Sequence, residues 1–288
     1  MRDLVRMLLL VVFICVTAAN ATPADQPAGQ EPLILGIHPY LPHDEIITRF
    51  TPLANYLARA IGRPVEVRVG RDYKEHINAI GDGTIDIAYM GPAPYVEMVK
   101  KFGKKPLLAR QVINGDPYLR GEIIVRQDSP FRTLADLRGK CFLFGDINST
   151  MSYILPQRML ERAGIPLSKL GSYQSLEGHK NVALAVLAGS CDAGAVKSEV
   201  FHEYESRGLR ALAELPLVAD HVFVASTRLP TSLVIKLREL LMALNELPEG
   251  APIMTGIHPE MTALVPAKDS DFDKLRVLMK SKFTPGAR

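Results

Sequence analysis

The residues best suited to chemistry in this chain lie in two short turns, at 145–152 and at 177–179. The first turn reads Gly-Asp-Ile-Asn-Ser-Thr-Met-Ser, and the second reads Glu-Gly-His. Each follows an expected strand and opens an expected helix, where free backbone N–H groups and the helix dipole attract anions. The hydroxyls of Ser149 and Thr150, together with the imidazole of His179, would therefore suit a tetrahedral oxyanion.

Each of these residues also has a plainer interpretation. Serine and threonine often cap helices, so Ser149 or Thr150 could serve only to begin a helix. A lone histidine is more often a surface or capping residue than a ligand. Catalysis is a further alternative, with Ser149, His179 and Glu199 as a hydrolytic triad, although the serine turn is not a G-x-S-x-G nucleophile elbow.

An alternation of strands and helices positions the two turns. Apolar runs predict strands at 33–37, 65–69, 85–89, 107–112, 118–126, 141–144, 172–176, 191–196 and 222–225. Helical spacing predicts helices at 46–61, 73–80, 93–102, 134–139, 149–163, 179–188 and 232–245. This order is typical of a mostly parallel sheet covered by helices, and its restart without a Pro/Gly-rich linker predicts two lobes joined by crossing strands.

Such sheets bind ligands at the carboxyl ends of their strands. The loop at 38–45 follows the first expected strand and contains two histidines, an aspartate and a glutamate. Its two prolines and irregular spacing do not favour a metal site. We expect this loop to face a ligand.

The N-terminus has the composition of a secretory signal peptide. Arg2 and Arg6 precede an apolar stretch at 7–16, and Ala-Asn-Ala at 19–21 forms a cleavage site. We expect residues 1–21 to be removed and the polar, Pro-rich leader at 22–32 to be disordered. An uncleaved anchor is the alternative, and no later run approaches the ~20 apolar residues of a membrane-spanning helix. The mature protein is therefore expected to be exported and soluble.

Export changes the interpretation of the cysteines. Cleavage leaves Cys141 and Cys191, and an even pair in an oxidising compartment favours a disulfide. In a sheet of order 2-1-3 both would lie at the N-terminal ends of neighbouring strands, away from a site at the opposite ends. Two buried free thiols remain the alternative.

The composition of the chain mainly excludes certain classes of protein. The 288 residues include 34 basic and 31 acidic ones, a net charge of +3, with 47% hydrophobic residues. These values exclude a disordered or collagen-like chain, and no basic stripe interleaved with aromatics suggests nucleic-acid binding. No Walker A or H-E-x-x-H motif is present, and we expect neither a metal nor a cofactor.

The chain resembles the phosphate/phosphite/phosphonate solute-binding proteins of ABC transporters. The family pattern D-P-x-S-T-S-G, followed by a proline, matches residues 146–152 and Pro156. A G-H pair opening a helix and a following V-D-A strand match 178–179 and 191–193. The D-Y and D-I-A-W-x-G elements match 72–73 and 86–91. The resemblance extends over most of residues 33–245.

The resemblance implies a two-lobed periplasmic binding protein fold of type 2. Lobe 1 would comprise 33–118 and 221–288, and lobe 2 would comprise 119–220. The lobes would close by a hinge around a small phosphonate or related oxyanion and present it to an ABC transporter permease, without turnover. The mature form would be a monomer and not an enzyme. A sensor subunit of a membrane-bound kinase or cyclase is the alternative.

The resemblance also assigns a ligand-binding set. The phosphonate head would be held by Ser149, Thr150, the backbone of Met151, and His179. An aminoalkyl group would be held by two tyrosines and two acids, Tyr73, Tyr118, Glu199 and Asp220. The acids would pair with an ammonium and the aromatic faces would add cation–π attraction. Without the resemblance, the tyrosines read as packing residues and Glu199 as a solvated acid.

Met151 departs from the family pattern, which has a serine at this position. A thioether cannot donate, and a lost hydrogen bond to a charged ligand costs about 1.5–3 kcal/mol, or roughly 10–150-fold in affinity. Ser152 could partly substitute. We therefore expect a ligand that is weaker, larger or less anionic than the usual one, or a pocket repurposed for an apolar or soft ligand.

Overall fold

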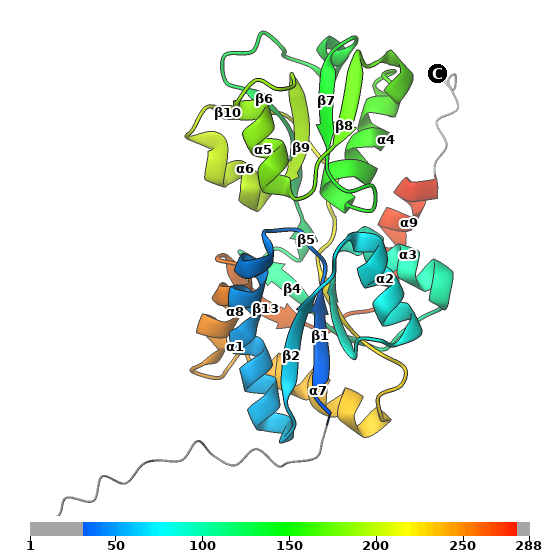
Figure 1. Cartoon of the computed structure of the whole chain (residues 1–288), viewed down its shortest axis with the longest axis vertical. Helices are drawn as coiled ribbons and strands as arrows, with labels where there is room; N and C mark the ends of the chain where they lie inside the picture. The colour runs from blue at the N-terminus through cyan, green and yellow to red at the C-terminus, as the bar shows by residue number, and fades with distance from the viewer. Residues whose placement is uncertain (1–30, 281–288) are drawn as a thin grey trace, which may run out of the picture.

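The computed structural model describes residues 31–280, which form two lobes stacked along the long axis of the molecule (Figure 1). The expected signal peptide and nearly all of the expected leader lie outside the described residues, as do residues 281–288 of the expected lobe 1. Each lobe has one central sheet covered by helices, which confirms the α/β fold class.

The first lobe is built on a six-stranded sheet of order β13-β4-β12-β3-β1-β2. Its strands are β1 (Leu33–Ile37), β2 (Val65–Val69), β3 (Ile87–Met90), β4 (Leu107–Ile113), β12 (Val222–Ala225) and β13 (Met261–Val265). Its helices are α1 (His43–Ile61), α2 (Tyr73–Asp82), α3 (Pro92–Phe102), α7 (Thr231–Ala243) and α8 (Gly250–Ile257). Strands β1, β2 and β3 are parallel, whereas β12 runs antiparallel to both of its neighbours.

The longest helix shows how the sequence builds this lobe. Ile46, Phe50, Leu53 and Leu57 recur at intervals of three or four residues along α1 and are all buried. This stripe faces the sheet, in which β1 is buried on both faces as central parallel strands usually are. The helix ends at Gly62, whose φ of 70° lies in the left-handed region that favours glycine.

The second lobe is built on a five-stranded sheet of order β10-β6-β9-β7-β8. Its strands are β6 (Gly121–Arg126), β7 (Cys141–Phe144), β8 (Ser172–Ser175), β9 (Ala193–Lys197) and β10 (Leu209–Glu214). Its helices are α4 (Leu155–Arg162), α5 (His179–Leu187) and α6 (Ser198–Glu205). The order β8-β7-β9 is the expected 2-1-3 arrangement. A disulfide joins Cys141 and Cys191 at the N-terminal ends of β7 and β9, with their Cα atoms 5.0 Å apart.

Two features connect the lobes. Strand β5 (Tyr118–Leu119) pairs antiparallel with β11 (Val218–Ala219), and this small sheet lies at the junction between the two large ones (Figure 1). The last helix, α9 (Asp273–Lys280), contacts α3 of the first lobe and α4 of the second. The side chain of Arg158 donates from Nη2 to the carbonyl of Met279 at 3.2 Å. The C-terminal helix therefore touches both lobes.

The structure differs from the sequence predictions in several places. The expected strand at 118–126 is divided at Arg120 into β5 and β6, and each sheet is mixed, with parallel pairing at one end and antiparallel pairing at the other. The expected helix at 149–163 begins with a π-helical turn (Thr150–Ile154) before α4. Six helices and strands were not predicted, namely α6, β10, β11, α8, β13 and α9. Within the described residues, no helix is long and apolar enough to cross a membrane.

Candidate functional site

Turns at the carboxyl ends of the parallel strands meet between the lobes and enclose a small cavity. His38 follows β1, Gly91 follows β3, Ser149 lies in the turn after β7, and Lys197 ends β9. The remaining residues that line the cavity are Tyr40, Tyr73, Pro92, Pro94, Leu119, Thr150, Met151, His179 and His221. In both lobes the cavity thus lies at the carboxyl ends of the strands, as expected for ligand sites of open α/β sheets. The loop after β1 faces the cavity.

Ser149 is both a helix cap and a lining residue. Its Oγ accepts the backbone N–H of Ser152 at 3.2 Å, which begins the π-helical turn. Burial raises the pKa of the neighbouring Tyr73 hydroxyl from the first lobe, and the Ser149 side chain partly offsets this rise. The capping interpretation and the ligand interpretation therefore apply to the same side chain.

Thr150 joins the turn to the opposite lobe. Its Oγ1 accepts the backbone N–H of Ala93, in the first turn of α3, at 2.9 Å. A hydroxyl that accepts one hydrogen bond still has its own proton to donate. Thr150 can therefore donate that proton to an oxyanion while it holds the N-terminus of α3 in place.

His179 is fixed in one tautomer by the backbone. The N–H of Lys197 donates to Nδ1 at 3.1 Å, so the ring proton must lie on Nε2, which is 3.5 Å from Ser149 Oγ. Burial, followed by the charge of Lys197, lowers the pKa of His179 to about 3. His179 is therefore a neutral hydrogen-bond donor at physiological pH.

This tautomer does not support the hydrolytic triad. A general base would need an unprotonated Nε2 facing the serine, held by a carboxylate at Nδ1. Here Nδ1 accepts a backbone N–H instead, and Glu199 bonds to Arg49. Neither the proton on the imidazole nor the position of Glu199 suits the removal of a proton from Ser149.

Lys197 and His221 are polar lining residues that sequence reasoning missed, and Lys197 carries a charge. The side chain of Lys197 is 7% exposed, its Nζ lies 4.2 Å from the centroid of the Tyr40 ring, and it forms an ion pair with Glu199. Burial lowers the pKa of Lys197, and the attraction of Glu199 acts in the opposite direction. Its place immediately after the expected strand at 191–196, at a carboxyl end, is the signal that could have identified it.

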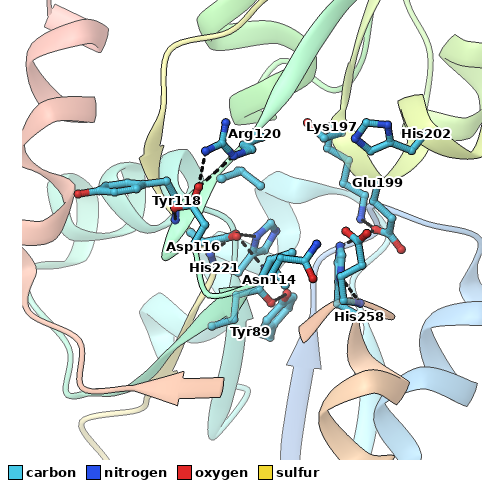
Figure 2. Close-up of a pocket in the computed structure, with 16 residues that line it drawn as sticks. Tyr89, Asn114, Asp116, Tyr118, Arg120, Lys197, Glu199, His202, His221 and His258 are labelled. Carbon is cyan, nitrogen blue, oxygen red and sulfur yellow. Dashed lines mark hydrogen bonds and ion pairs between the residues drawn. The ribbon is translucent and has the colours of Figure 1, made fainter. Parts of the chain in front are cut away.

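Glu199 lies beside Lys197 and His258 in the pocket (Figure 2), and Arg49 is its third partner. Its Oε1 accepts from Arg49 Nη1 at 2.8 Å, and its Oε2 lies 3.5 Å from His258 Nε2 and in contact with Lys197 Nζ. Burial would raise the pKa of Glu199, but the neighbouring positive charges, chiefly Lys197, outweigh burial and hold it well below its usual value. Glu199 is thus an ionised partner of protein side chains, which corrects its interpretation as a solvated acid.

Asp220 is held in a buried hydrogen-bond network. It is 1% exposed, and its Oδ1 accepts from Gln111 Nε2 at 2.9 Å and from the backbone N and Nδ1 of His221 at 2.6 and 2.8 Å. The ring of His221 stacks on Tyr89 and His38, with centroids 4.9 and 5.2 Å apart. Asp220 therefore positions His221, which lines the cavity.

The eight residues expected to bind ligand divide into two groups. Five of them line the cavity, namely Tyr73, Ser149, Thr150, Met151 and His179. The other three, Tyr118, Glu199 and Asp220, line an adjacent pocket of about 310 Å³ that shares Lys197 and His221 with the cavity. Tyr118 is 46% exposed and its ring points away from Lys197 and Glu199 (Figure 2). The structure does not bring Tyr118 to the cavity, because β5 turns it outward.

The departure at Met151 is not compensated by Ser152. The hydroxyl of Ser152 donates to the carbonyl of Ala195 at 2.5 Å, so it is committed to β9. Met151 is buried, and a Cβ placed on Gly121 would lie 3.0 Å from its Cβ. Met151 thus packs against the beginning of β6, and only its backbone can donate to a ligand.

The lobes are in direct contact around the cavity. Arg49 in α1 pairs with Glu199 in α6, Glu45 in α1 pairs with Lys180 in α5 at 3.2 Å, and Ala93 donates to Thr150. The cavity measures about 20 Å³, which is the scale of one water molecule. A tetrahedral oxyanion is larger, so its entry requires the lobes to separate. Among residues 31–280, no group of three or more His, Cys, Asp or Glu side chains is placed to hold a metal ion.

Two α/β lobes joined by crossing strands, with a polar cavity between them, define a periplasmic binding protein fold. The family model described as the periplasmic phosphonate substrate-binding protein of ABC transporters matches residues 35–272. The chain belongs to this family.

Relatives of known structure or name agree with this assignment. The chain is 25% identical over 252 residues to the phosphate-import protein PhnD of Mycolicibacterium smegmatis, covering 79% of this chain and 78% of that protein. A binding protein component of an ABC phosphonate transporter from Pseudomonas aeruginosa superposes with a TM-score of 0.79 at 20% identity, covering 87% and 86% of the two chains. PhnD1 from Prochlorococcus marinus, in complex with methylphosphonate, has a TM-score of 0.77 at 17% identity, covering 85% and 96%.

Proposed function

We propose that this protein captures a compact phosphonate or phosphate-class oxyanion between its two lobes and presents it to the permease of an ABC transporter. One observation carries the proposal most directly. Three donors from two turns converge on one buried cavity: the hydroxyls of Ser149 and Thr150, and Nε2–H of His179. Uncharged donors at helix N-termini suit an anion that must be bound and then released.

Binding would act through the lobes. We propose that 33–118 and 221–288 move as one lobe and 119–220 as the other, with β5 and β11 as the hinge; the pairing of these two short strands between the large sheets supports this division. An oxyanion that contacts both sides of the cavity binds the closed form more tightly than the open form, so it shifts the population toward closure. The closed form would be the one that the permease recognises.

The proposal includes export. Residues 1–21 would act as a cleaved signal peptide, as their basic, apolar and Ala-Asn-Ala segments suggest. The mature chain would be a periplasmic monomer that binds its ligand without turnover and without a cofactor. N-terminal sequencing of protein recovered from the periplasm would identify the cleavage site.

Isothermal titration calorimetry with methylphosphonate, phosphite and phosphate tests the binding function. We expect at least one of them to bind, and we expect Ser149→Ala and His179→Ala each to weaken binding roughly 10–150-fold, because each removes a donor to a charged ligand. Ser175→Ala is the matched control, since Ser175 is exposed on β8 and does not line the cavity. Its affinity should equal that of the wild type.

The absence of binding for all three anions would reject the ligand class. Binding that survives both Ser149→Ala and His179→Ala would place the site elsewhere in the molecule.

A further inference from the structure

An ammonium group of the protein occupies the place where the resemblance would put an ammonium of the ligand. Lys197 Nζ contacts Glu199, one of the two acids that would bind an aminoalkyl group. It also lies over the ring of Tyr40, which lines the cavity. An aminoalkyl ligand needs a carboxylate and an aromatic ring as partners for its ammonium. The ammonium of Lys197 already interacts with both.

The rest of Glu199 is also engaged. Arg49 donates to its Oε1, and His258 Nε2 approaches its Oε2. A ligand ammonium would have to displace one of these partners and leave it buried without its counter-charge, which is unfavourable.

One oxygen of the second acid is committed as well. Asp220 Oδ1 accepts three hydrogen bonds from His221 and Gln111, and Gln111 is held in turn by the hydroxyl of Tyr89 at 2.5 Å. Diverting Asp220 to a ligand would disturb the position of His221 in the cavity wall.

We propose that Lys197 is a specificity-determining residue that selects phosphorus oxyanions without an amino group and disfavours aminoalkyl phosphonates. The inference rests on the proposed function and narrows its ligand class to alkylphosphonates, phosphite and phosphate. Lys197 attracts the oxyanion from the wall that the cavity shares with the adjacent pocket, and it repels any second cation brought into that pocket. Selection by repulsion of the wrong ligand is a general device of specific sites.

A matched pair of ligands tests this directly. Ethylphosphonate and 2-aminoethylphosphonate differ only by the terminal amino group, and calorimetry gives the two dissociation constants for the exported protein. We expect ethylphosphonate to bind at least about tenfold more tightly, a difference of about 1.4 kcal/mol.

Two variants connect the preference to Lys197. Lys197→Met keeps an unbranched side chain and removes the charge. We therefore expect weaker binding of ethylphosphonate and tighter binding of 2-aminoethylphosphonate. The ratio of the two dissociation constants should fall at least tenfold. Lys180→Met is the control, because Lys180 pairs with Glu45 and Glu203 at the lobe boundary and does not line the cavity. It should leave the ratio of the two constants unchanged. If Lys197→Met does not fold, Lys197→Gln replaces it.

The outcomes are distinguishable. Equal or tighter binding of 2-aminoethylphosphonate by the wild type would overturn the role of Lys197 and leave the phosphonate function standing. An unchanged ratio in folded Lys197→Met and Lys197→Gln would also overturn it. Binding of no phosphonate, phosphite or phosphate at all would reject the proposed function and this inference together.

Discussion

The ion pair between Arg49 and Glu199 is expected to hold the lobes together, and its removal should open the protein. Arg49 lies in α1 of the first lobe and Glu199 in α6 of the second, and their side chains are only 16% and 14% exposed. Arg49→Met removes the contact and keeps most of the apolar stem. Glu199 then retains Lys197 and His258, so the carboxylate is not left without a partner.

The size of the effect follows from the geometry. A hydrogen bond of 2.8 Å between charged, mostly buried groups contributes about 1.5–3 kcal/mol. Losing it should shift the equilibrium between closed and open lobes roughly 10–150-fold toward the open form. The apparent dissociation constant for methylphosphonate should rise by up to the same factor, and by the whole factor where the open form already predominates.

Small-angle X-ray scattering and calorimetry measure the two quantities. We expect a larger radius of gyration for Arg49→Met without ligand and convergence with the wild type at saturating ligand. Arg59→Met is the control, because Arg59 lies on the same helix but pairs with Glu249 of the same lobe in an exposed contact. A double-mutant cycle that combines Arg49→Met with Glu199→Gln should give a coupling free energy between the two residues of at least about 1 kcal/mol. Unchanged scattering together with unchanged affinity in Arg49→Met, or additive effects in the cycle, would refute this reasoning.

Two further predictions concern stability. Burial lowers the pKa of His76, His179 and His258 to about 4, 3 and 4, whereas an unfolded histidine titrates near 6.5. The unfolded chain therefore takes up protons first, and stability falls with decreasing pH, by roughly 1–2 kcal/mol per histidine between pH 7 and pH 5; urea denaturation that gives equal free energies of unfolding at both pH values would contradict this. Removing the disulfide in Cys141→Ser/Cys191→Ser opens a loop of 50 residues and should lower the free energy of unfolding by about 4 kcal/mol. Because the bridge lies at the strand ends opposite the cavity, calorimetry should show the wild-type affinity for methylphosphonate.

Elements with strong local patterns could be predicted from the sequence. The strands at 141–144 and 222–225 have the predicted bounds, because short apolar runs flanked by turn residues specify buried strands. Strand β10 was missed because it lies at the edge of its sheet and is only partly buried, so its apolar pattern is weak. Helix α8 was missed because Pro252 lies within it, which argues locally against a helix.

Site residues that lie in the turn after a strand could be predicted from the sequence. The role of a residue that pairs with side chains distant in the sequence could not. Ser149, Thr150 and His179 follow their own strands directly, so sequence order alone places them at the carboxyl edge. The environment of Glu199 depends on Arg49 and His258, which are 150 and 59 residues away in the sequence. No local pattern records those partners, so the family resemblance, which assigned Glu199 to the ammonium of a ligand, gave the best available interpretation.

The pairing of Glu199 also connects specificity with closure. Arg49 and Lys197 bind the same carboxylate from opposite lobes, so Glu199 is both the anchor of the lobe contact and the counter-charge of the cavity lysine. A ligand ammonium that competed for Glu199 would therefore weaken closure as well as meet repulsion from Lys197. An oxyanion without an amino group has neither effect, because it contacts the donors of the cavity and leaves Glu199 with Arg49. Glu199 is thus not available to bind the ammonium of an aminoalkyl ligand, and its pairing with Arg49 lets the lobes close over a compact anion.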